Sequence, residues 1–584
     1  MRMYVASDRD TLRTIAERYA ASVAAVMRMN PGIGDPDRFI SGMTVRLPST
    51  PTTADAIADT SDDPTEGGMS APAIDTAVLP YPVSPPRSRV HADNWIPVIP
   101  AGTMAETEYD VLIVGSGAGG GAALWRLGER WVDSEKRIGV IEAGDTLLPT
   151  AAANLPMFTE CRLRHLWRSP KYLNRYGSFA LGQKGAASAD PSMFTQFIAL
   201  GGRTLIWPAV CPRMAPADFA GWPVTSKEMN NYYHLAEQVM KVNSNYARGS
   251  ALQDTLLGRL RSGGFTEAVD LPMAVDFAET RFGLMHSNVF FSSILFFALT
   301  MNRRSVDLAV QTRAVKVLVE NNRAAGIEVK SEDGSTHVIR AETIVLAAST
   351  IETPRLLLNS GLQGEAIGRY LTNHSCIKAS GIVQRADFPE ELGTLGIMLP
   401  PDERRPYQLT IKGPGSYFWY QDTLKPFRKE WGIEMTGTGY VQSRAENRVT
   451  LDPVRKDKYG VPEARIQFAY SEADWDVIER MADGIRRVSL AMNAPFTAEN
   501  GRPAFYLLSP GADNHDMGTC RMGVDPSTSA TNRFGQIHGI DGLFVADASV
   551  IPGSGAADPV LTVTALAIRT ADYIADLSEA SGRR

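Results

Sequence analysis

The sequence predicts an α/β protein in which a Rossmann-like dinucleotide-binding domain is combined with a second domain built on an antiparallel sheet. Three observations support this prediction. A short apolar strand over residues 109–114 runs directly into a glycine-rich loop and a helical pattern. Strand–helix patterns recur over residues 306–319 and 343–358. The C-terminal part of the chain adds a buried strand, a tight turn and an amphipathic helix, so strands and helices alternate as in α/β folds.

The glycine-rich loop has the spacing of a dinucleotide-binding site. Within its sequence GSGAGG, Gly115 allows the tight turn, Gly117 lets the backbone approach a pyrophosphate, and Gly120 lets helix and strand pack closely. A second strand over residues 138–141 ends in Glu142, where a carboxylate would accept hydrogen bonds from ribose hydroxyls. A glycine-rich connection without a ligand would not explain Glu142, so we expect a bound dinucleotide.

The C-terminal part of the chain supplies a second ligand-binding pattern. A buried strand over residues 543–545 leads to Asp547, a Gly/Pro-rich turn follows, and Pro559 opens a helix with Asp558 as its N-cap. An acid at the end of a strand and a helix N-terminus can together hold a ribityl chain and an electron-rich ring system. His515, on an irregular loop upstream, could be the base that such a ring system needs. This C-terminus indicates flavin chemistry.

Together with shorter segments between them, these motifs resemble the glucose–methanol–choline (GMC) family of FAD-dependent oxidoreductases, and within it the pyranose oxidase branch. The resemblance covers most of residues 106–584. Its further segments are GGRT (201–204) before Trp207, GWP (221–223) before YYHLAE (232–237), AAST (347–350) with TPRLL (353–357), GRYL (368–371) before His374, and NRV (447–449) before LD (451–452). The order of so many segments is specific for the family and less specific for a substrate.

The resemblance implies FAD as the cofactor and a set of residues that contact it. These residues are Gly115, Gly117, Gly120, Glu142, Gly201, Gly202, Thr204, Ala314, Val315, Asp547 and Pro559. The segment of Ala314 and Val315 resembles one whose backbone contacts adenine, although a plain sheet strand would also explain it. In pyranose oxidases a histidine just before the loop tryptophan bonds covalently to FAD. Ile206 stands at that position here, so we expect non-covalent FAD.

Oxidation of an alcohol requires a base for the hydroxyl proton while the carbinol hydride passes to flavin N5, and neutral histidine suits that role. His515 matches the histidine of the family's H-x-x-G-T loop, which makes it the expected catalytic base. His374 falls at another family position, where a histidine more often supports the structure. We expect His538 in a turn and His234 on a helix. Asp558 stands where the family usually has Asn or His as partner of the base, although a role as N-cap alone would also explain it.

For the substrate, the resemblance favours a secondary alcohol of a sugar or glycoside. One alternative is a bulky hydrophobic alcohol such as a sterol, since the aromatic run at residues 417–420 could stack on either kind of ring. Another alternative is a glycan-binding protein whose flavin domain is inert, although such a domain would be expected to have lost His515. The electron acceptor, whether oxygen, a quinone or a redox protein, stays open, as does the oligomeric state.

Four regions follow from these patterns. Residues 1–48 have a strand–helix–helix–strand outline similar to a LysM module, a fold that commonly binds N-acetylglucosamine polymers. Arg9 replaces the usual glycine and no tryptophan follows Leu12, so glycan binding and a protein-docking or vestigial role both stay open. Residues 49–105 form a linker rich in Pro, Ser, Thr and Asp. Residues 106–375 with 511–584 form the FAD-binding domain. Residues 376–510 form the substrate-binding domain, with strands at 408–411 and 465–470 in its sheet.

Bulk properties exclude several other classes of protein. The 584 residues carry a net charge of −6, so the basic footprint of a nucleic-acid-binding protein is missing. No apolar run reaches the ~18 residues that a membrane helix needs. The four cysteines are too scattered for a metal-ligand pattern or a disulfide framework, and we expect neither. The N-terminal residues do not read as a signal peptide, which makes the cytoplasm the expected location.

Overall fold

The structure, a computed structural model, divides into two units, residues 1–85 with 277–287 and residues 86–276 with 288–584. It describes residues 2–5, 10–18, 22–30, 33–38, 44–47, 96–147, 173–175, 178–180, 194–279, 286–362, 364–388, 395–413, 429–498 and 504–582. Most of the predicted linker and the aromatic run at 417–420 lie outside these residues.

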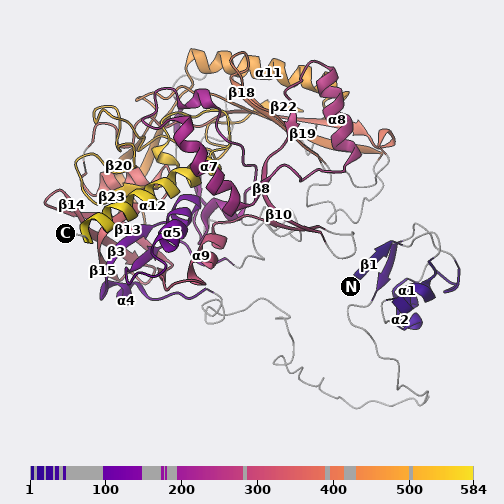
Figure 1. Cartoon of the computed structure of the whole chain (residues 1–584). Helices are drawn as coiled ribbons and strands as arrows, with labels where there is room; N and C mark the ends of the chain where they lie inside the picture. The colour runs from indigo at the N-terminus through magenta and orange to yellow at the C-terminus, as the bar shows by residue number, and fades with distance from the viewer. Residues whose placement is uncertain are drawn as a thin grey trace, which may run out of the picture. The chain divides into compact units, whose positions relative to one another are not determined.

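A seven-stranded sheet lies at one end of the larger unit, near the C-terminus (Figure 1). Strand β3 (Glu108–Val114) lies parallel between β4 (Ile138–Ile141) and β15 (Thr336–Leu346). The C-terminal strand β23 (Leu543–Val545) pairs in parallel with β15, so segments from both ends of the unit share one sheet. The remaining strands are β12 (Asp307–Ala309), parallel to β4, and the antiparallel β13 (Thr312–Glu320) and β14 (Arg323–Ser331). The predicted α/β fold is confirmed.

Two helices that begin at the ends of these parallel strands lie side by side (Figure 1). Helix α5 (Ala118–Arg130) follows the glycine loop, and α12 (Val560–Gly582) is the C-terminal helix. An ion pair between Arg126 and Asp572 joins them, with 2.7 Å between Nε and Oδ1. Because both helices start near the carboxyl ends of strands, their N-termini face the same region, the usual place of a ligand in α/β sheets.

A six-stranded antiparallel sheet forms the second layer of the unit, in the order β22-β16-β19-β18-β17-β9. Its strands are β22 (Phe505–Leu507), β16 (Ser375–Gln384), β19 (Glu430–Gly439), β18 (Tyr407–Lys412), β17 (Gly396–Leu399) and β9 (Val269–Asp270). Helices α8 (Ala251–Ser262) and α11 (Glu472–Met492) contribute apolar side chains to the same core as the sheet, which buries one of its faces.

The two faces of this sheet differ because side chains alternate along each strand. In β18, Leu409 and Ile411 belong to the apolar core, whereas Gln408 lies on the opposite face and reaches Asp558. In β19, Thr438 lies opposite Gln408 and donates to the backbone oxygen of Ala556. The sheet therefore presents a polar face to the loop that precedes α12.

One predicted strand lies in a different sheet from the one expected. Residues 465–468 belong to β21 (Pro462–Phe468), which pairs with β20 (Arg448–Lys456) and with β6 (Ser178–Ala180), not with β18. The reason is packing: Ile466 and Phe468 bury their side chains in a separate apolar cluster around Phe194. Alternation in the sequence identified a strand here but could not identify its neighbours.

The small N-terminal unit has the predicted order of elements. Strand β1 (Arg2–Val5) pairs antiparallel with β2 (Thr44–Leu47), and helices α1 (Leu12–Arg18) and α2 (Val23–Met29) lie between them in the chain. Its core consists of Leu12, Ile15, Ala16, Val26, Ile33 and Val45. Its identity as a LysM module stays a prediction.

Two general expectations can be compared with the described residues. Cys211, Cys376 and Cys520 are buried and free there, as expected of small apolar side chains. None of the described helices combines the length and the apolar character that crossing a membrane requires.

Candidate active site

The glycine loop between β3 and α5 has the geometry expected of a pyrophosphate-binding loop. Gly115 has φ +102°, and a Cβ atom there would overlap the carbonyl oxygen of Ala347. A Cβ at Gly120 would overlap the carbonyl oxygen of Gly115, so this glycine packs the helix against the loop. Gly117 has open space around it and a ligand can reach its backbone. The amides of the first turn of α5 point into the same space.

A cavity extends from this loop to the loop before α12. The predicted residues that line it are Gly115, Gly117, Glu142, Gly202, Thr204, Ala314, His515, Asp547, Asp558 and Pro559. The other three predicted cofactor residues are not among its lining residues: Gly120 packs as described, Gly201 binds Ser116 through its amide, and Val315 is buried in β13. The structure thus brings most of the predicted residues to one cavity.

Glu142 is buried and joins two loops of the cavity. Its Oε2 accepts hydrogen bonds from the amide and hydroxyl of Ser116, at 3.0 and 2.6 Å, and its Oε1 accepts from the amide of Gly144 at 2.7 Å. The Ser116 hydroxyl in turn accepts from the amide of Gly201 at 2.9 Å. Burial raises the pKa of Glu142, and these hydrogen bonds oppose that shift. Sequence reasoning missed Ser116, because a serine between glycines carries no local signal of this role.

Asp547 and Thr204 lie in the cavity wall and are held by protein groups. Asp547 Oδ2 accepts from the Ser349 amide at 2.9 Å and from the Thr353 hydroxyl at 2.5 Å, and burial raises its pKa. The Thr204 hydroxyl donates to the Gly201 oxygen at 2.6 Å and accepts from the Ser293 amide at 2.8 Å. Thr204 therefore fixes the shape of its loop through its side chain.

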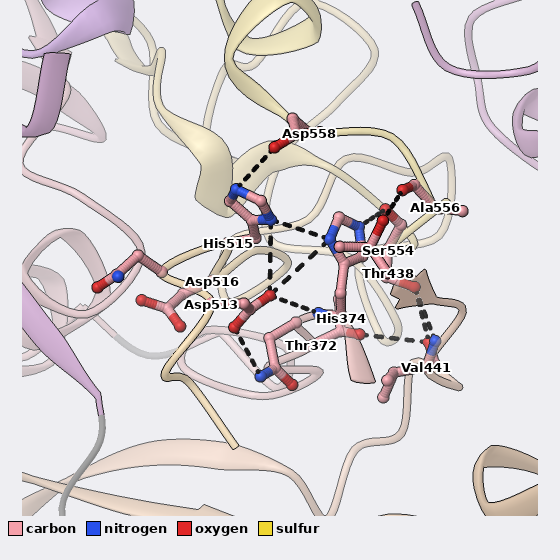
Figure 2. A network of polar contacts seen from close by, with 12 residues as sticks. Thr372, His374, Thr438, Val441, Asp513, His515, Asp516, Ser554, Ala556 and Asp558 are labelled. Carbon is pink, nitrogen blue, oxygen red and sulfur yellow. Dashed lines mark hydrogen bonds and ion pairs between the residues drawn. The ribbon is translucent and has the colours of Figure 1, made fainter. Parts of the chain in front are cut away.

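His515 lies at the far end of the cavity within a network of polar groups (Figure 2). Its Nδ1 is 3.0 Å from Nδ1 of His374, and its Nε2 is 3.3 Å from Oδ1 of Asp558. Asp513 Oδ2 lies 3.6 Å from Nδ1 of His515. His374 is buried, and its Nε2 lies 3.1 Å from the backbone oxygen of Ser554. One nitrogen of His515 is thus tied to buried groups, and the other faces Asp558 in the cavity wall.

The predicted N-cap role of Asp558 is wrong. Its Oδ2 accepts a hydrogen bond from Nε2 of Gln408 at 3.2 Å, and its Oδ1 faces His515. Within the described part of the chain, no hydrogen bond joins this carboxylate to an amide of α12, which begins at Val560. The cause is tertiary: a side chain from the antiparallel sheet and a histidine from another loop orient the carboxylate away from the helix.

A second buried acid lies next to the histidine. Asp516 pairs with Arg203, with 3.2 Å between Oδ2 and Nη2, and both residues line the cavity. Burial raises the pKa of Asp516 to about 6, although the Arg203 charge opposes the shift. Sequence reasoning passed over both residues. Two further histidines lie as expected from the sequence, His234 exposed on helix α7 (Ser226–Met240) and His538 bonded to Ser529 in a turn.

Comparison with known proteins gives one family for this arrangement. Two models, both described as GMC oxidoreductase, match residues 102–376 and 443–567. A C-glycoside 3-oxidase from Arthrobacter globiformis is 28% identical over 65% of this chain and 74% of its own length. A 2-methyl-1,2-propanediol dehydrogenase from Mycolicibacterium austroafricanum is 24% identical over 81% of this chain and 96% of its own length. A pyranose 2-oxidase from Tricholoma matsutake is also a relative.

Solved structures agree at the level of the fold. A pyridoxine 4-oxidase, described as from Mesorbium loti, superposes with a TM-score of 0.57 and 17% identity, over 80% of this chain and 99% of its own. The two matched segments include the glycine loop at one end of the cavity and His515 and Asp558 at the other. The chain therefore belongs to the GMC oxidoreductase family and is an FAD-dependent oxidoreductase.

Proposed function

We propose that this enzyme oxidises a secondary alcohol of a sugar or glycoside, with His515 as the catalytic base and Asp558 as its partner. The observation that carries the proposal is the position of His515 Nε2, in the cavity wall and 3.3 Å from a carboxylate. A base must come within hydrogen-bond reach of the proton that it removes, and a neutral imidazole nitrogen suits that role near pH 7.

The polar face of the antiparallel sheet supports a sugar over a sterol. Gln408 and Thr438 lie on this face and contact the loop of Asp558, and the pair Thr410 and Thr436 follows one step further along the same strands. Hydroxyl and amide groups can exchange hydrogen bonds with a polyol. A sterol offers a single hydroxyl group and a large apolar surface, which matches this polar face less well than a polyol does.

The residues of the cavity fit FAD. The open backbone at Gly117 and the first turn of α5 can hold a pyrophosphate, and Glu142 ends the neighbouring strand where a ribose would lie. Ala314 lines the same side of the cavity, and Asp547 and Pro559 continue the wall towards His515. When bound, FAD supplies the acceptor for the carbinol hydride.

The chain's own residues then supply orientation and proton transfer. Gln408 holds one oxygen of Asp558, which leaves the other beside His515 Nε2. A substrate hydroxyl that reaches Nε2 from the cavity can give its proton to this nitrogen. The Asp558 carboxylate then stabilises the positive charge that forms on the imidazole, because opposite charges at this distance attract strongly in a partly buried site.

An anaerobic reduction screen tests the proposal. Sugars, glycosides and sterols are added to the oxidised enzyme, and bleaching of the flavin absorbance is followed. We expect bleaching by a sugar or glycoside and none by sterols. Bleaching by sterols alone, or a yellow protein that no alcohol bleaches, would contradict the proposal. Admitting air and then a dye separates an oxidase from an enzyme that needs a quinone or a redox protein.

The mode of FAD attachment has its own test. Ile206 lines the cavity and has no nucleophilic atom, so we propose that FAD is bound without a covalent link at this position. Acid or heat precipitation should leave the flavin in the supernatant. Flavin that stays in the washed pellet would show a covalent bond to another residue.

For residues 1–48 we propose a docking role, with a glycan polymer or another protein as the partner. The supporting observation is a small separate core between the two strands and two helices of this unit. Co-sedimentation of the full chain with peptidoglycan or chitin tests the glycan alternative, and unchanged sedimentation would exclude it.

A further inference from the structure

A buried histidine lies behind the proposed base and determines which of its nitrogens carries a proton. The backbone oxygen of Ser554 can only accept a hydrogen bond, and it lies 3.1 Å from Nε2 of His374. His374 Nε2 must therefore carry a hydrogen. The remaining nitrogen of this ring, Nδ1, lies 3.0 Å from Nδ1 of His515 (Figure 2). Only one of the two facing nitrogens can hold the hydrogen of that contact.

The hydrogen between the rings belongs to His515. If His374 held it, its ring would carry protons on both nitrogens and a full charge in a site where it is only 1% exposed. Burial, and after it the neighbouring His515, lower the pKa of His374 to about 4, although Asp513 and Asp558 oppose the shift. His374 is therefore neutral near pH 7, and its Nδ1 is an acceptor.

We propose that His374 is a positioning residue that holds His515 in the tautomer with a proton on Nδ1 and a free lone pair on Nε2. This inference rests on the proposed function of His515 as the base. The lone pair on Nε2 is the one that a substrate hydroxyl in the cavity can reach. The opposite tautomer would turn the lone pair towards buried protein groups and leave the base unable to act.

Hydrogen bonds fix the position of the loop of residues 554–556, whose Ser554 carbonyl group contacts His374. The Ser554 hydroxyl accepts from the amide of Val441 at 2.9 Å and donates to its oxygen at 3.1 Å. The Thr438 hydroxyl donates to the oxygen of Ala556 at 2.8 Å. These bonds tie residues 554–556 to the end of β19, so the carbonyl group that holds His374 cannot turn away easily.

Asp513 completes the arrangement from a third side. Its Oδ2 accepts from the backbone amide of His374 at 3.1 Å, and Oδ1 accepts from Nδ2 of Asn373 at 3.3 Å. The same Oδ2 lies 3.6 Å from Nδ1 of His515 and 3.8 Å from Nδ1 of His374. Once His515 has taken a proton, this carboxylate and Asp558 flank the charged ring on its two nitrogens. The proton stays on His515, because passing it to His374 would place the charge on the more buried ring.

Nitrogen NMR of the holoenzyme labelled with ¹⁵N-histidine tests the tautomer directly. The His515→Ala and His374→Leu variants assign the two rings. We expect His515 Nδ1 to stay protonated while its Nε2 gains a proton as the pH falls. His374 should show a protonated Nε2 and a bare Nδ1 near pH 7. A protonated Nδ1 on His374 at that pH, or a neutral His515 with its proton on Nε2, would overturn the proposal.

Kinetics of two substitutions give a second readout. His374→Leu removes the acceptor for Nδ1–H, and we expect the rate constant of flavin reduction to fall on the order of 10²-fold. KM and FAD content should stay unchanged. His374→Asn offers an amide oxygen near the same point and should recover most of the rate. Equal, near wild-type rates in both variants would overturn the proposal. If His374→Leu fails to fold, the wild-type NMR titration still decides.

Two further experimental outcomes can be distinguished from the NMR and kinetic results above. His374, Asp513 and His515 place nitrogen and oxygen atoms within 4.8 Å of one another, a spacing that a metal ion could also use. One equivalent of zinc in the wild type that His374→Leu lacks would overturn the proposal, because a metal would replace the shared proton. If His515→Ala keeps the full reduction rate, the proposed function fails, whereas the NMR result on the tautomer is unaffected.

Discussion

The two ends of the cavity are built in different ways. At the proposed cofactor end, the loop expected to hold a pyrophosphate offers mostly backbone groups, and it belongs to one continuous strand–loop–helix segment around Gly117. At the catalytic end, side chains from four separate segments converge: His374, Gln408, the loop of Asp513 and His515, and Asp558. The first end depends on local geometry, and the second depends on the assembly of the whole unit.

This difference predicts how each end responds to substitution. Changes at the cofactor end should alter FAD binding and leave the chemistry of the loaded enzyme largely intact. Changes at the catalytic end should alter the rate or its pH dependence and leave FAD binding intact. A variant that changes both FAD binding and the rate of the loaded enzyme would show that the two ends are coupled.

The largest effect is expected from His515→Ala. Loss of a general base should lower the rate constant of flavin reduction by roughly 10²–10⁴-fold, while FAD stays bound. Anaerobic stopped-flow absorbance measures this constant. His234→Ala is the matched control, because His234 is exposed on α7 and should leave the rate unchanged. A His515→Ala enzyme within about threefold of the wild type would remove the base from the proposed mechanism.

A smaller effect, at the other end, is expected from Glu142→Ala. The ribose hydroxyls lose a charged acceptor, and hydrogen bonds to charged groups are worth roughly 1.5–3 kcal/mol, or about 10- to 150-fold in Kd. Titration of the apoprotein with FAD measures the affinity. The reduction rate at saturating FAD should be near that of the wild type. Glu320→Ala, at an exposed position of β13, is the control. Unchanged FAD retention would argue against the assignment of Glu142.

The contrast between the two ends also explains what could be predicted from the sequence. Gly115, Gly117, Gly120 and Glu142 were found because a short segment encodes its own geometry: a turn that only glycine permits and a strand that ends in an acid. The same holds for the order of strands and helices. Ala314 was placed in the cavity wall by resemblance alone.

The catalytic end could be predicted only in part. His515 was found through its loop motif, but its contact with His374 joins positions 141 residues apart and leaves no local pattern. Gln408 looks like any polar residue of a half-buried strand. The resemblance placed Asp558 beside His515, but its N-cap role was predicted wrongly. An acid before a helix matches the pattern of an N-cap, whereas the partners of this carboxylate come from another sheet and another loop. Local signals cannot encode such long-range partners.

The third prediction concerns acid stability. The pKa of His374 is about 4 in the folded state because the ring is buried, against about 6.5 in the unfolded chain. Between these values the unfolded state binds a proton that the folded state does not, so folding stability is lost as the pH falls. The loss should be on the order of 3 kcal/mol between pH 7 and pH 4.

Urea unfolding of the wild type and of His374→Asn at pH 7 and pH 4.5 measures this loss of folding stability. The variant lacks the ionisable ring and should lose less stability between the two conditions. Asp516, whose pKa burial raises to about 6, acts in the opposite direction and is present in both proteins, so it cancels in the comparison. The same pH dependence in both proteins would show that His374 takes up a proton in the folded state as readily as in the unfolded chain.

The smallest effect is expected from Asp558→Asn. The carboxylate does not cap α12, so thermal stability and FAD binding should stay unchanged. The substitution removes a negative charge 3.3 Å from His515 Nε2, and this charge favours the protonated imidazole. The pH profile of flavin reduction should therefore shift. Asn keeps the size of the side chain and an oxygen for Gln408, which makes it a test of charge alone.

Gln408→Leu, which frees the carboxylate but keeps its charge, should move the profile less. An unchanged profile in Asp558→Asn would mean that the carboxylate and the imidazole are not coupled, and that the catalytic end relies on His374 and Asp513 alone.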